Sequence, residues 1–429
     1  MCTESECVFC ILDEPIGRGR LKVGTLEHRI LMTLHISPGE NPVSALTPEL
    51  ISSVAAVAEG LAEDIISLTT EITEVAAPTN DESIRAHLVH RRFAELGYEN
   101  VTTDDLSNVV GKLSGLRSDR PALLLAAHTD TVFPHGVPIK VTRKGDSLFA
   151  PGVGDNSVSV ATVAMLATAL NQLGIVTATD IYVTGNVGEE GLGDLRGMCA
   201  VVDQLPNLGA VIAVEGHSLG RITYRAVGSK RLRVTITGPG GHSWGDAGRP
   251  SAIHALARLV AKLDDIPLAS EPKTSLNVGL FEGGLSVNTI APEATIVIDM
   301  RSTSAEALQQ LVAQVETTIK TARRKDISVE VEVVGDRPAG EMPMDSGIVP
   351  IGVQVLKHLE IDAICDASST DANIPISRGI PSMCIGLTTG GNAHRLDEFI
   401  RLPPLGKGFT QLILTVLAVS DALADGTLV

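Results

Sequence analysis

Cysteine is scarce in this sequence, with six residues in 429. That number is too small to indicate a disulfide framework in a chain of this length. Half of the cysteines stand in the first ten residues, as Cys2, Cys7 and Cys10, and the last two form a Cys-x-x-Cys pair. Such a pair can hold a structural zinc if a fourth ligand is supplied. No second pair follows, so an N-terminal extension without a metal is the favoured interpretation.

The sequence also lacks a long apolar run, a basic leader and an excess of positive charge. No apolar run reaches the roughly 18 to 20 residues that span a bilayer, and the acidic first thirty residues do not resemble a secretory signal. The formal net charge of -17 argues against a nucleic-acid partner, because that binding depends on basic patches. We therefore expect a cytoplasmic protein with small-molecule chemistry and no membrane partner.

What is present is a globular composition, 44% hydrophobic and 20% charged, in a chain long enough for two domains. After an N-terminal extension over residues 1–46, helical patterns alternate with short apolar strands, which indicates an α/β domain with a mixed sheet. Residues 229–335 instead follow the order strand, helix, strand, strand, helix, strand, which is the split βαβ arrangement of a ferredoxin-like domain. We expect this segment to be inserted into a catalytic domain made of residues 47–228 and 336–429.

The predicted elements define this division more closely. In the catalytic domain we expect helices over residues 47–73, from the turn at 78–82 to about 97, 158–173 and 347–359, and strands over 108–113, 122–127, 180–184 and 382–387. In the inserted domain we expect strands over 232–237, 275–281, 295–300 and 328–334, and helices over 251–263 and 305–322.

Histidine and acidic residues stand at the ends of several predicted strands, where α/β proteins place their sites. His128 ends an apolar strand, and Asp130 faces the same way two residues later, so it is placed to orient the imidazole of a metal ligand. Alone, a structural His–Asp pair is the more common reading. Asp155, in a glycine-flanked turn before a helix, would alone be read as a helix cap.

Three further carboxylates and a second histidine complete the pattern. Glu189 and Glu190 are adjacent in a turn whose flanking glycines allow both to point inward, Glu215 ends another apolar strand, and His394 follows a glycine pair. Each would alone be read as a solvated or structural residue. Together they form the donor set of a zinc pair, in which a bridging Asp155 and a bridging hydroxide complete four-coordinate sites. This count uses Glu190 and Glu215 as ligands and leaves Glu189 as the general base.

From about residue 80 to 398 the sequence resembles the zinc aminoacylase and carboxypeptidase G family, which includes tripeptide aminopeptidase, acetylornithine deacetylase, succinyl-diaminopimelate desuccinylase and aminoacylase. The resemblance implies five metal ligands: His128 with Glu215, Glu190 with His394, and Asp155 as the bridge. It also implies that Glu189 is the base, that Asp130 orients a ligand, and that a cis peptide follows Asp155.

The resemblance assigns roles in the inserted domain as well. His242, in a glycine-rich turn, is implied to reach across a dimer and to stabilise the tetrahedral intermediate, with a plain turn histidine as the alternative. Asn288 resembles the substrate-binding asparagine, and Arg337 the arginine that meets the substrate carboxylate. Arg301 is a second candidate, for which a structural ion pair is favoured, and the segment 369–373 is expected only to shape the pocket.

These observations predict a two-zinc metallohydrolase, with cobalt or manganese as alternative metals, that cleaves amide bonds of di- or tripeptides as an exopeptidase. Its substrate would carry a free carboxylate, and it would form a homodimer through the inserted domain. An N-acyl amino acid deacylase of the same family is the alternative. A binding protein that has kept the fold without catalysis is disfavoured, because every ligand position and the base position are filled.

Overall fold

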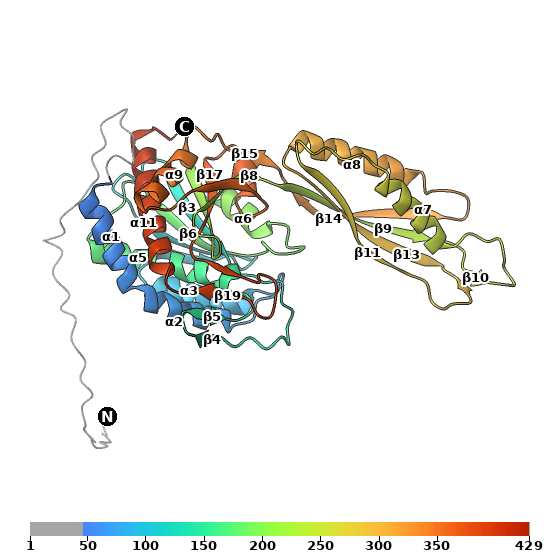
Figure 1. The fold of residues 1–429 in the computed structure, drawn as a ribbon, viewed down its shortest axis with the longest axis horizontal. Coiled ribbons are helices and arrows are strands. Elements are labelled where there is room, and N and C mark those ends of the chain that lie inside the picture. The colour runs from blue at the N-terminus through green and yellow to red at the C-terminus, as the bar shows by residue number, and fades with distance from the viewer. Residues whose placement is uncertain (1–45, 429) are drawn as a thin grey trace, which may run out of the picture.

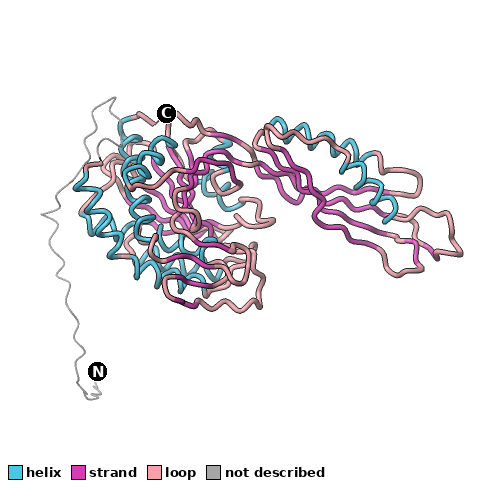
Figure 2. Tube along the Cα trace, viewed as in Figure 1, coloured by secondary structure: helices cyan, strands magenta, loops and turns pink. Residues whose placement is uncertain are grey.

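The computed structural model describes residues 46–428, which form two domains (Figures 1 and 2). The cysteine pair and the extension up to residue 45 lie outside the described residues. In Figure 1 the larger domain contains both the blue helices from the start of the described chain and the red helix at its end, whereas the yellow segments form an elongated second domain. The second domain is therefore an insertion in the larger domain, which is formed by the two ends of the described chain.

A mixed nine-stranded sheet forms the centre of the larger domain. Its order is β1-β2-β6-β3-β7-β17-β8-β15, with β16 paired to β8. The central strands β6, β3, β7 and β17 run parallel, whereas β1, β2, β8 and β15 supply antiparallel pairings. The strands are β1 (Glu99–Thr103), β2 (Val109–Leu113), β3 (Ala122–His128), β6 (Ile181–Asn186), β7 (Leu208–Glu215), β8 (Arg221–Ala226), β15 (Gly340–Glu341), β16 (Ile364–Ser368) and β17 (Ser382–Gly386).

Helices cover both faces of this sheet, which explains why β3 is buried along its whole length and apolar up to its last residue, His128. Successive side chains of a strand point to opposite faces. Leu123 and Leu125 accordingly join the larger core, and Leu124 joins the smaller one. The larger core is shared with α1 (Pro48–Gly60), α2 (Ala62–Thr73), α3 (Ser83–Glu95), α4 (Val158–Ala164), α5 (Leu166–Leu173), α9 (Ile348–His358) and α11 (Leu405–Asp425). The smaller core is shared with α6 (Arg196–Gln204) and α10 (Asn373–Ser377).

Two helices that we expected to be continuous are interrupted. The first breaks at Leu61, directly after Gly60, a residue of low helix propensity. The second breaks at Met165, between α4 and α5, and nothing in the sequence marks that position.

The longest described helix, α11, is absent from our sequence-based prediction. It is buried on nearly all sides, so its sequence lacks the polar face that gives a helical period. Leu405–Asp425 and Val153–Leu173 are also long and apolar enough, by length and composition, to cross a membrane. This corrects our expectation that no segment reaches that length. Their most apolar windows are 94% and 89% buried inside the protein, which is the behaviour of core helices.

One carboxyl group of α11 is expected to make stability depend on pH. Burial, with a contribution from Asp425, raises the pKa of Asp421 to about 7, and its Oδ2 has no hydrogen-bond partner among residues 46–428. Between about pH 4 and pH 7 the unfolded chain loses this proton while the folded chain keeps it, so stability falls as pH rises. Asp421→Asn should therefore raise the free energy of unfolding above pH 7, by at most about 4 kcal/mol.

Urea denaturation at pH 5 and pH 8 measures this difference. Asp425→Asn, on the exposed end of the same helix, is the control and should give only a small gain. A gain for Asp421→Asn that is equal at both pH values would contradict the titration argument.

The second domain is a four-stranded antiparallel sheet of order β11-β13-β9-β14. Its helices α7 and α8 cover one face and share a core with Leu232, Val234 and Ile298. Chain order and sheet order together give the predicted ferredoxin-like arrangement, and the mixed α/β class of the other domain is likewise confirmed. The elements are β9 (Gly228–Thr237), α7 (Ala252–Asp264), β11 (Thr274–Gly283), β13 (Glu293–Ser302), α8 (Ala305–Lys320) and β14 (Ser328–Arg337), with β10 (Gly241–His242) and β12 (Thr289–Ile290) paired separately.

A small antiparallel sheet of order β18-β19-β5-β4 lies on the catalytic domain. It is formed by β4 (Thr142–Lys144), β5 (Ser147–Phe149), β18 (Gly390–Gly391) and β19 (Phe399–Arg401). The rings of Phe149 and Phe399 stack with centroids 5.4 Å apart. This sheet fixes both ends of the loop between β18 and β19.

Polar contacts join the base of the inserted domain to the loop after β6. Arg231 donates from NH1 to the carbonyl of Gly191 at 2.5 Å, and the backbone N–H of Asp336 donates to the carboxylate of Asp194 at 2.7 and 2.9 Å. Asn373 donates to the carbonyls of Val227 and Pro338, each at 2.9 Å, where the chain enters and leaves the domain. The base of the inserted domain is thus tied to the loop that carries Glu189 and Glu190.

Candidate active site

The predicted ligands meet at one edge of the main sheet. His128 and Glu215 are the last residues of the parallel strands β3 and β7, and Glu190 lies in the loop after β6. Because β3, β6 and β7 are parallel neighbours, their carboxyl ends lie at the same edge. Asp155 comes from the turn Val153–Ser157 that precedes α4, and His394 from the loop between β18 and β19.

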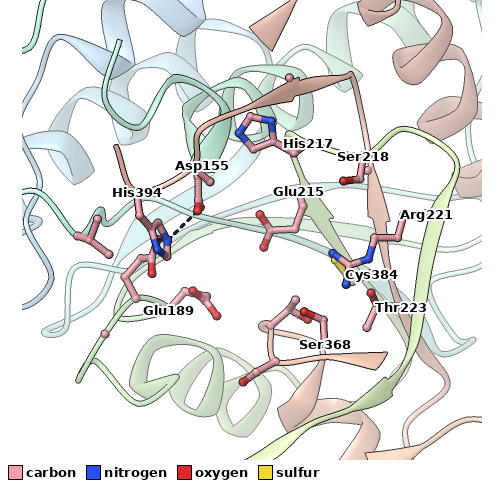
Figure 3. A pocket seen from close by; sticks show the side chains of 18 of the residues that line it. Asp155, Glu189, Glu215, His217, Ser218, Arg221, Thr223, Ser368, Cys384 and His394 are labelled. Carbon is pink, nitrogen blue, oxygen red and sulfur yellow. Dashed lines mark hydrogen bonds and ion pairs between the residues drawn. The ribbon is translucent and has the colours of Figure 1, made fainter. Parts of the chain in front are cut away.

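Asp155 lies between His128 and His394. Its Oδ1 is 3.1 Å from Nε2 of His128, and its Oδ2 is 3.1 Å from Nε2 of His394. Figure 3 shows the second of these contacts, between Asp155 and His394. Oε1 of Glu190 lies 2.9 Å from the same nitrogen of His394, and Oε2 of Glu215 lies 3.8 Å from that of His128. The five residues thus divide into two pairs with one shared carboxylate. The peptide bond after Asp155 is cis, which confirms the expectation from the family resemblance.

These spacings, from 2.9 to 3.8 Å, bracket those of zinc ligands. Two ligand atoms that each lie about 2.0 to 2.2 Å from a zinc ion at tetrahedral angles are separated by roughly 3.3 to 3.6 Å. Donor atoms of His128, Asp155 and Glu190 all lie within 4.8 Å of one another. Imidazole nitrogens and carboxylate oxygens are the donors that zinc and similar divalent ions accept.

The charges of the cluster also fit a cation. Burial, with repulsion from Asp155, raises the pKa of Glu215 to about 8. The carboxylates of Asp155 and Glu190 raise the pKa of His394 to about 10. Burial alone would lower the pKa of His128, but the carboxylates of Asp130 and Asp155 outweigh it and hold that pKa well above its usual value. Closely spaced carboxylates favour a positive charge among them, which a proton or a metal ion can supply.

Asp130 has a wider role than the sequence indicates. Nδ1 of His128 lies 3.1 Å from the backbone carbonyl of Asp130 and 3.6 Å from its carboxylate, so the carbonyl is the nearer acceptor. The carboxylate instead accepts the backbone N–H groups of Glu189 and Glu190, both at 2.9 Å, and the hydroxyl of Thr79 at 2.8 Å. Asp130 therefore orients the imidazole of His128 through its backbone carbonyl and holds the turn of Glu189 and Glu190 through its side chain.

Glu189 is buried and contacts Arg337, which the sequence predicts to bind substrate. NH1 of Arg337 donates to Oε1 of Glu189 at 3.1 Å and to Oγ of Ser369 at 3.2 Å, and NH2 donates to the backbone carbonyl of Glu189. Burial raises the pKa of Glu189 well above its usual value, against the opposing charges of His128 and Arg337. Arg337 is 5% exposed, and its buried Nε has no hydrogen-bond partner among residues 46–428.

Two residues that the sequence analysis left without a role, Glu398 and His217, support the Asp155 turn. Glu398 is fully buried and accepts the backbone N–H groups of Gly152, Gly154 and Asp155 at 2.6, 2.9 and 2.8 Å. Nε2 of His217 lies 3.0 Å from Oε1 of Glu398. The acceptor and the turn it holds are more than 240 positions apart, so no local pattern in the sequence marks this contact.

The segment 369–373 contributes to the pocket and to its supports. Ser369 and Thr370 line a cavity of about 640 Å³ that also contains Glu189, Glu190 and Glu215. Asp371 is buried, accepts a hydrogen bond from Asn186 at 2.8 Å, and has its pKa raised to about 6 by burial. The cavity falls in the usual size range of small-molecule sites.

His242 and Asn288 do not reach this cavity in the single chain. They lie together at the far tip of the inserted domain, where β10 pairs with β12 and the N–H of Ser243 donates to the carbonyl of Asn288 at 2.9 Å (Figure 1). Trp244 beside them is 87% exposed. Arg301 is in the expected ion pair, with its Nε 2.7 Å from Asp299, although it also lines the cavity.

Comparison with known proteins agrees with this arrangement. The profile of the peptidase dimerisation domain of the M20 group matches residues 224–327, and that of peptidase family M28 matches residues 108–221. An acetylornithine deacetylase of Photorhabdus laumondii is 23% identical over 80% of this chain and 92% of its own length. A probable carboxypeptidase of Trichophyton verrucosum is 26% identical over 58% of this chain, which spans only 57% of that relative. A tripeptidase structure from Staphylococcus aureus has the same fold, with a TM-score of 0.72 at 21% identity over 84% of this chain and 99% of its own.

The fold and these matches define the class as a hydrolase of amide bonds, and the structure contains a candidate metal site. Within that class the matches support the M20 group of peptidases, the zinc aminoacylase and carboxypeptidase G family that the motifs of this chain resemble.

Proposed function

We propose that this protein is a metal-dependent exopeptidase that uses two divalent ions, zinc in the first place, to cleave small peptides with a free carboxylate. The observation that carries the proposal is Asp155, whose two carboxylate oxygens each lie 3.1 Å from a different histidine. One ion would be held by His128 and Glu215, the other by Glu190 and His394, and Asp155 would bridge them. Bound ions of this kind lower the pKa of water and polarise a carbonyl group.

Glu189 is placed to act as the general base. It lies beside Glu190 in the loop after β6 and lines the same cavity as four of the proposed ligands, Asp155, Glu190, Glu215 and His394. Its backbone is held by Asp130, and its carboxylate by Arg337, so the side chain has a defined position. In this role it takes a proton from the nucleophilic water and passes it to the leaving amine.

His242 and Asn288 would act on the site of a second subunit. Both lie at the tip of a domain whose sequence matches a peptidase dimerisation domain, far from the metal ligands of their own chain (Figure 1). In a homodimer formed through this domain, His242 would donate a hydrogen bond to the developing oxyanion, a contribution that is large in many hydrolases. Each active site would then contain residues of both subunits.

The exopeptidase is favoured over an N-acyl amino acid deacylase by the fold match to a tripeptidase, whereas the acetylornithine deacetylase relative supports the alternative. The two activities share one chemistry and differ in what lies on the acyl side of the amide. A panel of dipeptides, tripeptides and N-acyl amino acids separates them.

Metal removal tests the proposal as a whole. Chelation followed by dialysis should abolish hydrolysis of every substrate in the panel, and zinc, cobalt or manganese should restore it. Elemental analysis of the restored protein should find two ions per chain, because five ligand side chains surround two positions. Full activity in protein shown to be free of metal would contradict the mechanism.

A further inference from the structure

Glu398 stands in the loop between β18 and β19, which also carries the proposed metal ligand His394. Its side chain reaches out of that loop and accepts backbone N–H groups from the turn that contains Asp155. Glu398 and Asp155 are 243 positions apart in the sequence. Glu398 therefore connects the loop of one histidine ligand directly to the carboxylate that is proposed to bridge both ions.

Both oxygens of the Glu398 carboxylate take part in this connection. Oε2 accepts the N–H of Gly152 at 2.6 Å, and Oε1 accepts those of Gly154 and Asp155 at 2.9 and 2.8 Å. Hydrogen bonds from backbone N–H groups to a carboxylate are charge-assisted and stronger than those between neutral groups. Because Glu398 is fully buried, protein groups take the place of water around its carboxylate.

His217 contacts the same carboxylate from a third element. Its Nε2 lies 3.0 Å from Oε1 of Glu398, whereas its Nδ1 is buried and has no partner among residues 46–428. His217 lines the cavity and comes two residues after Glu215, which ends β7 (Figure 3). The ring consequently ties the end of a ligand-bearing strand to the loop that contains Glu398.

The packing around the His217 ring requires glycine on two sides. A Cβ atom at Gly154 would collide with Nε2 of the ring and would lie 2.9 Å from Oε1 of Glu398, and a Cβ atom at Gly390 would lie 2.7 Å from Nδ1. Protein interiors are close-packed, so a ring held on both sides cannot move away from such contacts without disturbing its neighbours. The Asp155 turn and β18 are thus fitted closely around the contact between His217 and Glu398.

The two proposed ions would depend on this contact to different degrees. His128 and Glu215, the ligands of one ion, end strands of the main sheet and are held by its hydrogen bonds. His394, a ligand of the other ion, lies in a loop, and its side chain is 54% exposed. The position of His394 is therefore set by the contacts that fix its loop, and Glu398, four residues later, is a buried anchor of that loop.

We propose that Glu398 and His217 are positioning residues that hold the loop of His394 against the turn of Asp155, and that they thereby control whether the ion bound by His394 is retained. This inference rests on the proposed two-ion site. When the contact is broken, the His394 ion binds more weakly, whereas the ion at the ends of β3 and β7 stays bound.

The experiment measures how Glu398→Gln binds metal. Glutamine offers one acceptor oxygen in place of two, so part of the turn loses its hydrogen bonds. Groups that orient metal ligands typically change metal affinity by about ten- to a hundredfold, and we expect a loss of this size for one ion only. Titration of the metal-free protein with cobalt(II), followed by visible absorption and elemental analysis, measures each ion. The one-ion spectrum should match that of Glu190→Gln, which lacks a proposed ligand of the same ion, and saturating cobalt should restore turnover in Glu398→Gln.

Two substitutions of His217 test the contact from its other side. His217→Gln keeps an N–H donor near Glu398 and should bind both ions as the native protein does, whereas His217→Phe removes the donor and should weaken the His394 ion. Asp180→Asn is the matched control, because Asp180 is also a buried carboxylate that accepts a backbone N–H, from Gly115 at 2.9 Å, but it precedes β6 at the opposite edge of the sheet. This control should become less stable in urea while its metal affinity stays unchanged.

Native affinity for both ions in Glu398→Gln and in His217→Phe would overturn the proposal. An equal loss of both ions would also overturn it, because that result indicates a general disturbance of the fold. If Glu398→Gln does not fold, the comparison of His217→Phe with His217→Gln decides. If the native protein itself binds fewer than two ions, the proposed function fails, and that result is distinct from the others.

Discussion

Glutamine in place of Glu189 is expected to lower turnover on the order of a hundredfold or more while both metal ions stay bound. A loss in turnover of this size is typical of an enzyme that lacks its general base. Glutamine has nearly the same shape, and its amide oxygen can still accept the hydrogen bond that Arg337 donates to the carboxylate. The contacts that hold the turn involve the backbone of Glu189, whose N–H donates to Asp130 and whose carbonyl accepts from Arg337. The exchange therefore removes proton transfer without releasing the turn. Single-turnover kinetics and elemental analysis on the same preparation measure the two quantities.

Glu190→Gln is the matched control, one position away in the same turn. Its carboxylate lies 2.9 Å from Nε2 of His394, with which it is proposed to hold one ion, so this variant should lose metal affinity as well as activity. Comparison of these two variants distinguishes the general base from the metal ligand. Normal turnover by Glu189→Gln, or unchanged metal binding by Glu190→Gln, would show that the two roles are wrongly assigned.

Mixed dimers of two inactive chains are expected to recover activity. His242→Ala and Glu189→Gln should each be nearly inactive as homodimers, because one lacks the oxyanion donor and the other the base. In the hybrid, the site that takes both Glu189 and its metals from the His242→Ala chain receives an intact His242 from the other subunit. One working site of two should return up to about half of the native rate.

Orthogonal affinity tags allow the hybrid to be purified and its composition verified. The mixture of two separately tagged Glu189→Gln chains is the control, and it should stay inactive. A verified hybrid that is as inactive as its parents would place His242 outside the partner's site.

The convergence of the five proposed ligands could be predicted because each of them follows a local signal in the sequence. His128 and Glu215 end apolar strands, and Asp155, Glu190 and His394 lie in turns beside glycines. The carboxyl ends of parallel strands meet at one edge of an α/β sheet. Residues that follow different strands in the sequence can therefore be expected to lie close together in the fold. Glu398 has no such signal. Its partner Gly154 lies 244 positions away, and only the folded structure shows which N–H groups its carboxylate meets.

The same reasoning explains which parts of the fold were missed. The strands β3 and β9 are apolar or alternate clearly, and the structure places strands there. The short strands β15 and β18 have two residues each, too few for a period to be recognised. The helix α11 is long, but it is surrounded by other elements and carries apolar residues on nearly every side. Its sequence therefore shows no polar face from which a helical period could be recognised.

The polar contacts at the base of the inserted domain would serve as the pivot of any rotation of that domain, and they lie beside Glu189 and Glu190. Gly191 and Asp194 are held close to the axis about which the domain would turn, so a small rotation displaces them little. The same rotation is multiplied along the length of the sheet before it reaches His242 at the tip (Figure 1). In the proposed homodimer, such a rotation would leave the position of Glu189 nearly unchanged but would move His242 relative to the partner's active site. We therefore expect a substitution at Arg231 to alter catalysis in the partner subunit without any change in the partner's own sequence.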